Sequence, residues 1–146
     1  YTRTELESRA EIEYEAYSKT VNIEAKTMLS MMKKTFLPSV LSYCKELAET
    51  AAKTKAILPD APISAESKLL EKLSGLYTEI SEKTEALAEA EKAAESMEDN
   101  IEKVAYFHYT ILAKMDDLRS SVDTAEALIP DSFLPYPTYD ELLFSV

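Results

Sequence analysis

The chain has 146 residues, enough for one domain with one hydrophobic core. It contains one glycine and six prolines, and its formal net charge is −11. That charge argues against nucleic acid and anionic membrane surfaces as partners, because both are bound through clustered Lys and Arg. The single glycine favours helices, since sheets and tight turns need residues with positive φ.

Three further features of the sequence concern the cellular compartment, the membrane and the extent of the chain. Cys44 is the single cysteine, so an internal disulfide is excluded and a reducing compartment is indicated. No apolar run reaches the length of about 18 residues that a membrane-spanning helix needs. The chain starts at Tyr1 with neither an initiator Met nor a signal peptide, which predicts a piece of a larger protein.

The first 56 residues carry apolar side chains every three or four positions, the spacing of one face of an α-helix. These side chains are Leu6, Ala10, Tyr14, Tyr17, Val21, Ala25, Met28, Leu29, Met32, Phe36, Val40, Tyr43, Leu47 and Ala51. The spacing continues in phase through Pro38, which favours a kink in one long helix. Alternatively, one helix ends at Phe36 and Pro38 lies in the first turn of the next.

The beginning of this helix has a polar face made almost entirely of Glu, and Tyr14 and Tyr17 lie on its apolar side. An apolar face of this kind needs a surface to pack against. If the rest of the domain does not cover it, we expect the partner to be another chain or an upstream domain.

Two more helices follow a break at ILPDAPI, residues 57–63. The first spans 64–95, with Gly75 inside it, and its apolar stripe is Leu69, Leu73, Leu76, Ile80, Thr84, Leu87 and Ala94. The stripe of the second has gaps that alternate four and three, typical of a bundle seam. It is Met97, Ile101, Val104, His108, Ile111, Met115, Leu118, Val122, Ala125 and Ile129.

The pattern predicts an all-α fold, an antiparallel three-helix bundle over residues 1–129 with helices at about 3–56, 64–95 and 98–129. Residues 130–146 form an irregular tail rich in proline and aromatic residues. Because so many large apolar side chains are unfavourable in water, we expect the tail to dock on a protein surface. The candidate docking residues are Phe133, Pro135, Tyr136, Pro137, Tyr139, Leu142, Leu143 and Phe144.

Other candidate sites are weaker. His108 lacks the Glu three residues earlier and the second His of a bundle metal site, so we expect a buried or half-buried seam histidine. Cys44 has no activating neighbour and is predicted to be structural. The methionines are predicted to fill the core. Glu11, Glu13 and Glu15 lack the Gly and the alternating ligands of a calcium loop.

Two segments resemble the C-terminal region of type III glutamine synthetases, the large bacterial form of that enzyme. The first is IEAKTMLSMMKKTFLPSVLSY, residues 23–43, and the second is FLPYPTYDELLFSV, residues 133–146. The family has an IEA-x-TM pattern followed by a Pro within an apolar run, and it ends in a pattern close to WP-aromatic-PTY-x-x-LLF. Leu134 stands where the family usually has Trp.

The resemblance implies a parent enzyme that joins ammonia to glutamate with ATP and Mg²⁺ or Mn²⁺, in the cytoplasm, as a dodecamer of two stacked hexameric rings. It implies that the catalytic, nucleotide-binding and metal-binding residues lie upstream of Tyr1. None of their motifs occurs here, so no catalytic, cofactor-binding or metal-binding residue is assigned. The chain is then an accessory domain whose partners are its own catalytic domain and neighbouring subunits.

Two functions of other classes remain as alternatives. The regular seam of 97–129 and the acidic faces also suit a stand-alone helical module that binds a basic protein partner. A metalloenzyme built in the bundle core would need Glu-x-x-His pairs, and position 105 is Ala.

Overall fold

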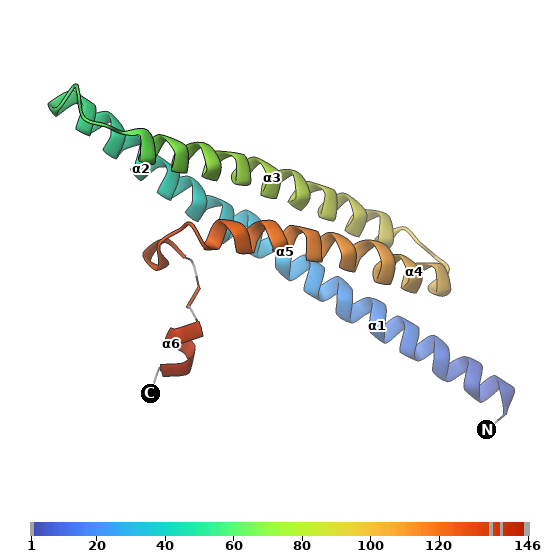
Figure 1. Ribbon diagram of the computed structural model, residues 1–146. Helices are drawn as coiled ribbons and strands as arrows, with labels where there is room; N and C mark the ends of the chain where they lie inside the picture. Colours follow the sequence, from blue (N-terminus) through green and yellow to red (C-terminus); the bar gives the residue numbers. More distant parts are fainter. Residues whose placement is uncertain (1, 135, 138, 145–146) are drawn as a thin grey trace. The chain divides into compact units, whose positions relative to one another are not determined.

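A computed structural model describes residues 2–134, 136–137 and 139–144. In chain order the elements are α1 (Arg3–Met31), the π-helix η1 (Met32–Phe36), α2 (Leu37–Ile57), α3 (Ser64–Glu95), α4 (Asn100–Tyr106), the π-helix η2 (Phe107–Ile111), α5 (Leu112–Glu126), the 3-10 helix η3 (Asp131–Phe133) and α6 (Tyr139–Phe144) (Figure 1). The described residues contain no strand, and the predicted all-α class is confirmed.

The long first helix is confirmed as well, because every residue from Arg3 to Ile57 is helical through α1, η1 and α2. Pro38 lies in the first turn of α2, directly after the π-helical turn. A proline donates no backbone hydrogen bond and its ring crowds the carbonyl four residues earlier, here that of Lys34. The wider π turn relieves this crowding. The structure thus combines the two interpretations of Pro38: the helical run continues, and a new α segment begins.

The chain divides into two compact units, which we describe separately. Unit 1 consists of Tyr1–Met31 and Glu82–Arg119, and unit 2 consists of Met32–Ser81 and Ser120–Val146. Unit 1 therefore holds α1, the second part of α3, α4, η2 and the beginning of α5. Unit 2 holds η1, α2, the first part of α3, the end of α5, η3 and α6.

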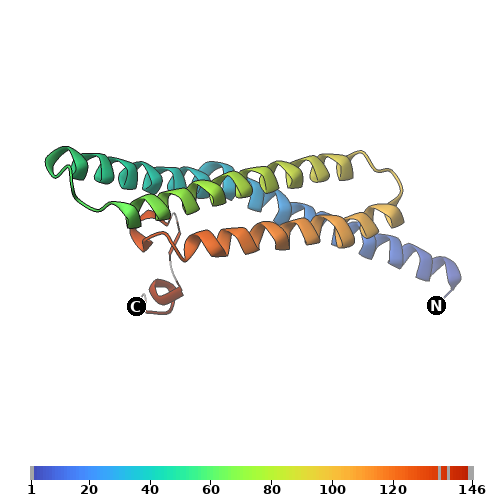
Figure 2. The same cartoon turned by 45° about the horizontal axis from the view of Figure 1, so that its top comes forward.

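The core of unit 1 is formed by three helical segments. Its buried apolar residues are Val21, Ala25, Leu29, Leu87, Ala90, Ala94, Phe107, Ile111 and Leu118. Figure 2 shows the chain turning back from α3 into α4, so these two segments are antiparallel. Lys26 of α1 reaches α3, where its Nζ lies 2.7 Å from Glu95 Oε1 and 3.3 Å from Glu91 Oε1. The hydrogen bond to Glu95 is the main reason that the pKa of Lys26 is raised.

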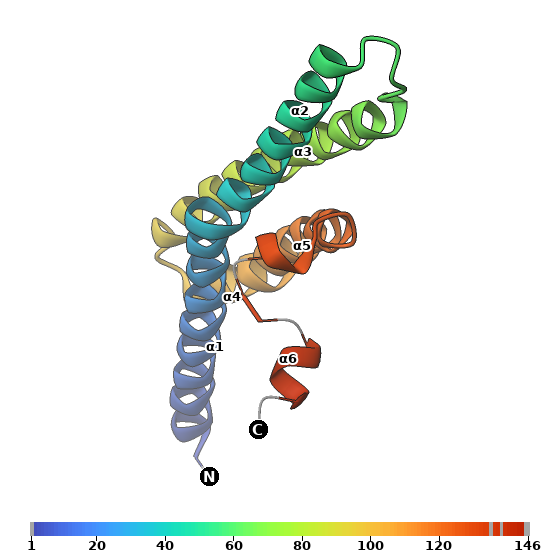
Figure 3. The same cartoon turned by 90° about the vertical axis from the view of Figure 1, so that its left-hand side faces the viewer.

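The core of unit 2 is formed around the π-helical turn η1. Its buried apolar residues are Met32, Phe36, Leu37, Val40, Cys44, Leu73, Ile80, Val122, Ala125 and Ile129. Figure 3 shows the segment of residues 58–63 that leads from α2 back to α3. On the buried side of α5, the Ser121 hydroxyl donates a hydrogen bond to Glu79 Oε1 at 2.7 Å.

One part of the predicted seam is wrong. His108 and Ile101 are exposed, and Phe107 is buried in place of His108. The change occurs within the π-helical turn η2, which wraps more residues per turn than an α-helix and shifts the register of the face. Burying the Phe107 ring is favoured over burying an imidazole, since the imidazole would have to lose its contacts with water.

The N-terminus of α4 is capped by Asp99, whose Oδ1 accepts hydrogen bonds from the amides of Ile101 and Glu102, both at 2.8 Å. Asp99→Ala leaves these two amides without their side-chain acceptor. We expect a loss of about 1 kcal/mol in the free energy of unfolding, measured by urea denaturation. Asp99→Asn should retain most of the stability, and an alanine variant as stable as the parent would show that the cap contributes nothing.

Gly75 lies exposed within α3, and a Cβ built there meets no atom within 4 Å in the described part of the chain. The glycine therefore serves no close helix approach, and it costs helix stability through its backbone freedom. We expect Gly75→Ala to raise the free energy of unfolding by about 1 kcal/mol. The same urea experiment measures it; an unchanged or lower value would mean that an unseen neighbour needs the space.

Candidate interaction sites

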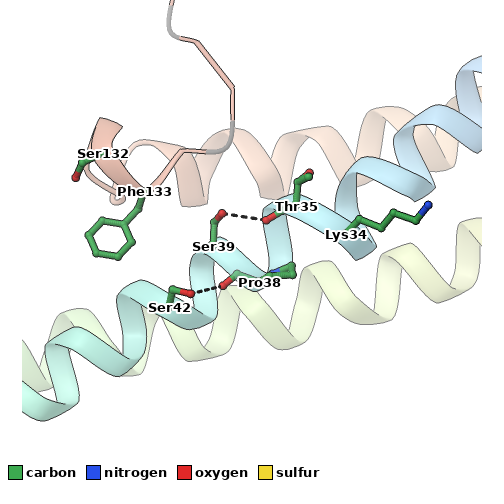
Figure 4. A pocket seen from close by; sticks show the side chains of 7 residues that line it. All are labelled: Lys34, Thr35, Pro38, Ser39, Ser42, Ser132 and Phe133. Atoms are coloured by element: carbon green, nitrogen blue, oxygen red, sulfur yellow. Dashed lines mark hydrogen bonds between the residues drawn. The ribbon is translucent and has the colours of Figure 1, made fainter.

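The tail begins at Pro130, shortly after α5 ends at Glu126. The Phe133 amide donates to the Pro130 carbonyl at 2.8 Å, and the Leu134 amide donates to the Asp131 carbonyl at 3.0 Å. These bonds form the single 3-10 turn η3. The turn reverses the chain over a few residues, and this reversal aims Phe133 at α2 (Figure 4).

The first half of the tail is bound to unit 2 itself. The rings of Phe133 and Tyr43 are tilted by 49° with their centroids 5.1 Å apart, a favourable aromatic contact. Three residues beyond Phe133, the Tyr136 hydroxyl donates a hydrogen bond to the Glu126 carboxylate. The side chains of Phe133 and Tyr136 are both half-buried, so these two contacts attach the two residues to unit 2.

The second half of the tail is different. Leu142, Leu143 and Phe144 of α6 are 60%, 72% and 79% exposed. Pro137 is exposed too, whereas Pro135 and the side chain of Tyr139 lie outside what the structure describes. Those of the predicted docking residues that the structure describes thus separate into an anchored part, Phe133 and Tyr136, and an exposed apolar part, Leu142, Leu143 and Phe144 of α6. Their role in docking remains a prediction.

A hollow of about 380 Å³ opens beside the anchor, lined by Lys34, Thr35, Pro38, Ser39, Ser42, Ser132 and Phe133 (Figure 4). The hydroxyls of Ser39 and Ser42 donate to the carbonyls of Thr35 and Pro38, both at 2.9 Å, as the dashed lines show. Their protons are thereby committed to the backbone, and Lys34 is the one cation in the lining. A nucleotide phosphate needs several convergent donors, so this hollow does not fit one.

The remaining polar candidates also lack the features of an active site. Cys44 is buried, and loss of contact with water raises the pKa of its thiol, which disfavours the nucleophilic thiolate. In the described residues, no three His, Cys, Asp or Glu side chains gather closely enough to hold a metal ion. No described helix is both long and apolar enough to cross a membrane.

The predicted burial of His108 is wrong, as the register shift in η2 explains. The side chain lies at the surface, where its Nδ1 is 3.0 Å from the Tyr17 hydroxyl. Its ring meets that of Tyr109 edge-on, with centroids 4.8 Å apart. The periodicity of the seam could not predict that His108 is exposed. The sequence did contain one signal, because the neighbouring Phe107 is more apolar than His108 and is better suited to the core.

The beginning of α1 presents a further uncovered surface. The predicted stripe is buried or half-buried from Tyr17 onwards, yet Leu6 and Tyr14 at its start are exposed. Ile12 and Ile23, which lie off the stripe, are exposed as well. Sequence periodicity singled out the first pair and missed the second, since isolated apolar residues on a polar face give no periodic signal.

Comparison with known proteins finds similar sequences. A family model described as "Glutamine synthetase C-terminal domain" matches residues 1–55, a range that includes most of the long first helix, which begins at Arg3. A glutamine synthetase of Butyrivibrio fibrisolvens is 38% identical over all of this chain and 21% of its own length. One of Bacteroides fragilis (strain YCH46) is 30% identical over 99% of this chain and 20% of its own length.

A relative from Dictyostelium discoideum named "Type-3 glutamine synthetase" is 28% identical over 96% of this chain and 20% of its own length. The chain spans about a fifth of the length of these curated relatives. It is similar to the C-terminal domains of glutamine synthetases. More narrowly, its resemblance to the C-terminal helical region of the type III form is confirmed.

Proposed function

We propose that this chain is the accessory C-terminal domain of a type III glutamine synthetase and supplies no catalytic group itself. The parent enzyme joins ammonia to glutamate at the expense of ATP, in the cytoplasm. The observation that carries the proposal is the alignment of nearly the whole chain with about a fifth of the length of three enzymes named as glutamine synthetases.

ATP and the Mg²⁺ or Mn²⁺ of the parent are assigned to its other domains. The residues described here do not fit either group. No set of three metal-ligating side chains gathers among them. The hydroxyls of the hollow beside Phe133 already donate to backbone carbonyls. We therefore derive no step of the reaction from these side chains.

In this proposal the domain contributes to assembly. The exposed apolar part of the tail, Leu142, Leu143 and Phe144, packs on the catalytic body or on a neighbouring subunit of the parent, a dodecamer of two hexameric rings. The contacts of Phe133 and Tyr136 with unit 2 keep the tail in place for this purpose.

A chimera tests the proposal. The matching fifth of the Butyrivibrio fibrisolvens enzyme is replaced by this chain, and glutamine synthesis and assembly size are measured. We expect an active assembly of the parent's size, whereas removal of the matching region without replacement should reduce assembly. The proposal fails if the chimera stays unassembled while the parent assembles, or if removal leaves size and activity unchanged.

A further inference from the structure

A second hollow, of about 370 Å³, lies on unit 1 between α1 and the π-helical turn η2. It is lined by Glu13, Tyr14, Tyr17, Val104 and His108. Its lining is unlike that of the hollow beside Phe133, because aromatic rings and one carboxylate replace the serines. Glu13, Tyr14 and His108 are exposed, while Tyr17 and Val104 are half-buried and form its deeper part.

Two of the three rings in this hollow, those of Tyr17 and His108, are held in place by a mutual contact. The Tyr17 hydroxyl and His108 Nδ1 are 3.0 Å apart, and the two rings are tilted by 47°. The Tyr109 ring also contacts the His108 ring, edge-on. Rings that are fixed in this way present aromatic faces at little further entropic cost.

The carboxylate in the lining is available to a partner. In the described part of the chain Glu13 forms no ion pair, whereas its neighbours do: Arg3 Nε lies 2.8 Å from Glu7, and Lys19 Nζ lies 2.7 Å from Glu15. The stretch from Arg3 to Ala16 holds five Glu and two Arg, so the surface around the hollow is acidic.

We propose that this hollow binds the guanidinium group of an arginine that a partner polypeptide presents to it. A planar guanidinium can stack on the face of a tyrosine ring while its N–H groups donate to a carboxylate, and Tyr14 and Glu13 offer both partners on adjacent positions. The ammonium group of a lysine is compact and strongly hydrated, so it uses such a flat aromatic surface less well.

Charge excludes the competing occupants. An anion would meet the Glu13 carboxylate and a chain of net charge −11. A second copy of this chain would bring the same acidic helix face towards the hollow, which like-charge repulsion disfavours. A basic segment with apolar neighbours fits better, because Leu6 is exposed two turns before Glu13 on the same side of the helix and can pack against it.

The test uses His108, the single histidine of the chain, as a built-in probe. The imidazole resonances are followed by nuclear magnetic resonance at constant pH while N-acetyl-arginine amide is added. N-acetyl-citrulline amide, similar in shape but uncharged, serves as the control, and sodium chloride is used to match ionic strength. We expect a saturable shift with the arginine compound alone; an equal shift with citrulline, or none with either, would overturn the proposal.

Two matched variants localise the effect. Glu13→Gln should weaken binding of the arginine compound by about fivefold, the size of one exposed cation–aromatic or ionic contact. Glu11→Gln, an exposed acid of the same helix outside the lining, should change it little. Equal effects of the two variants would reduce the site to general surface charge and refute it. Shifts that depend on protein concentration without added arginine would make a second copy the occupant, against the proposal.

Discussion

Phe36→Ala is expected to lower the free energy of unfolding by about 3–5 kcal/mol. The Phe36 ring is fully buried at the end of the π-helical turn η1, in the core of unit 2. The substitution removes the transfer free energy of the ring and leaves a cavity that a rigid helical run can close only in part. Urea denaturation followed by far-ultraviolet circular dichroism measures the loss.

Leu41→Ala is the control, because Leu41 is a large apolar residue of the same helix that points to the surface. Leu41→Ala should lower the free energy of unfolding by less than about 1 kcal/mol, because the Leu41 side chain remains largely exposed to water in the folded chain. A similar loss from both substitutions would mean that Leu41 is covered in solution. If Phe36→Ala costs under about 1 kcal/mol, the core around η1 is not packed as described.

Phe107→Ala gives an independent comparison, because Phe107 is buried within the other π-helical turn, η2, in unit 1. The sequence predicts one bundle over residues 1–129, so both alanine variants should shift a single cooperative transition. Two transitions, each moved by one variant, would show instead that the two units unfold separately and would contradict the prediction of a single domain.

The helices could be predicted because their signals are local and repeated. The stripe from Val21 to Val40 and the stripe from Leu73 to Ala94 each combine a helical period with strong helix formers. Each contains a single helix-disfavouring residue, Pro38 in the first and Gly75 in the second. The break predicted at 57–63 was equally easy to recognise, since its two prolines cannot donate helix hydrogen bonds and its aspartate favours a turn. Such features depend on neighbours a few residues apart, which the sequence displays directly.

The two π-helical turns could not be predicted, because they result from competition between side chains for the core. A regular repeat assigned the seam position to His108, whereas packing favoured Phe107, and one turn with an altered period resolved the conflict. At Pro38 the same device removes a steric clash within the backbone. Periodicity averages over several turns, so a change of register within one turn lies below its resolution.

The interaction sites were predictable in part. The tail was recognisable by its excess of apolar residues. Its division into an anchored part and an exposed part depends on contacts with Tyr43, which is far from the tail in the sequence, and with Glu126, which belongs to α5. The hollow between Glu13 and His108 is lined by residues of α1 and of η2, which are far apart in the sequence. No local pattern announces a site of that kind.

Replacing the exposed apolar part of the tail is expected to prevent assembly of the chimeric synthetase. The triple substitution Leu142→Glu, Leu143→Glu and Phe144→Ser removes three side chains whose burial contributes about 1.5–3 kcal/mol each. Two carboxylates at the same place add a desolvation cost to any interface. We expect the assembled fraction, measured by analytical ultracentrifugation, to fall more than about tenfold, since 1.4 kcal/mol already corresponds to that factor.

The isolated chain provides the control for this last prediction. Because the three side chains are mostly exposed there, the triple variant should unfold at the same temperature as the unchanged chain. Ile57→Glu, at an equally exposed apolar residue at the end of α2, should leave assembly of the chimera intact. A marked fall in the unfolding temperature would mean that α6 packs within the chain. A normal assembled fraction in the triple variant would exclude α6 from the interface and leave the anchored residues Phe133 and Tyr136 as the functional part of the tail.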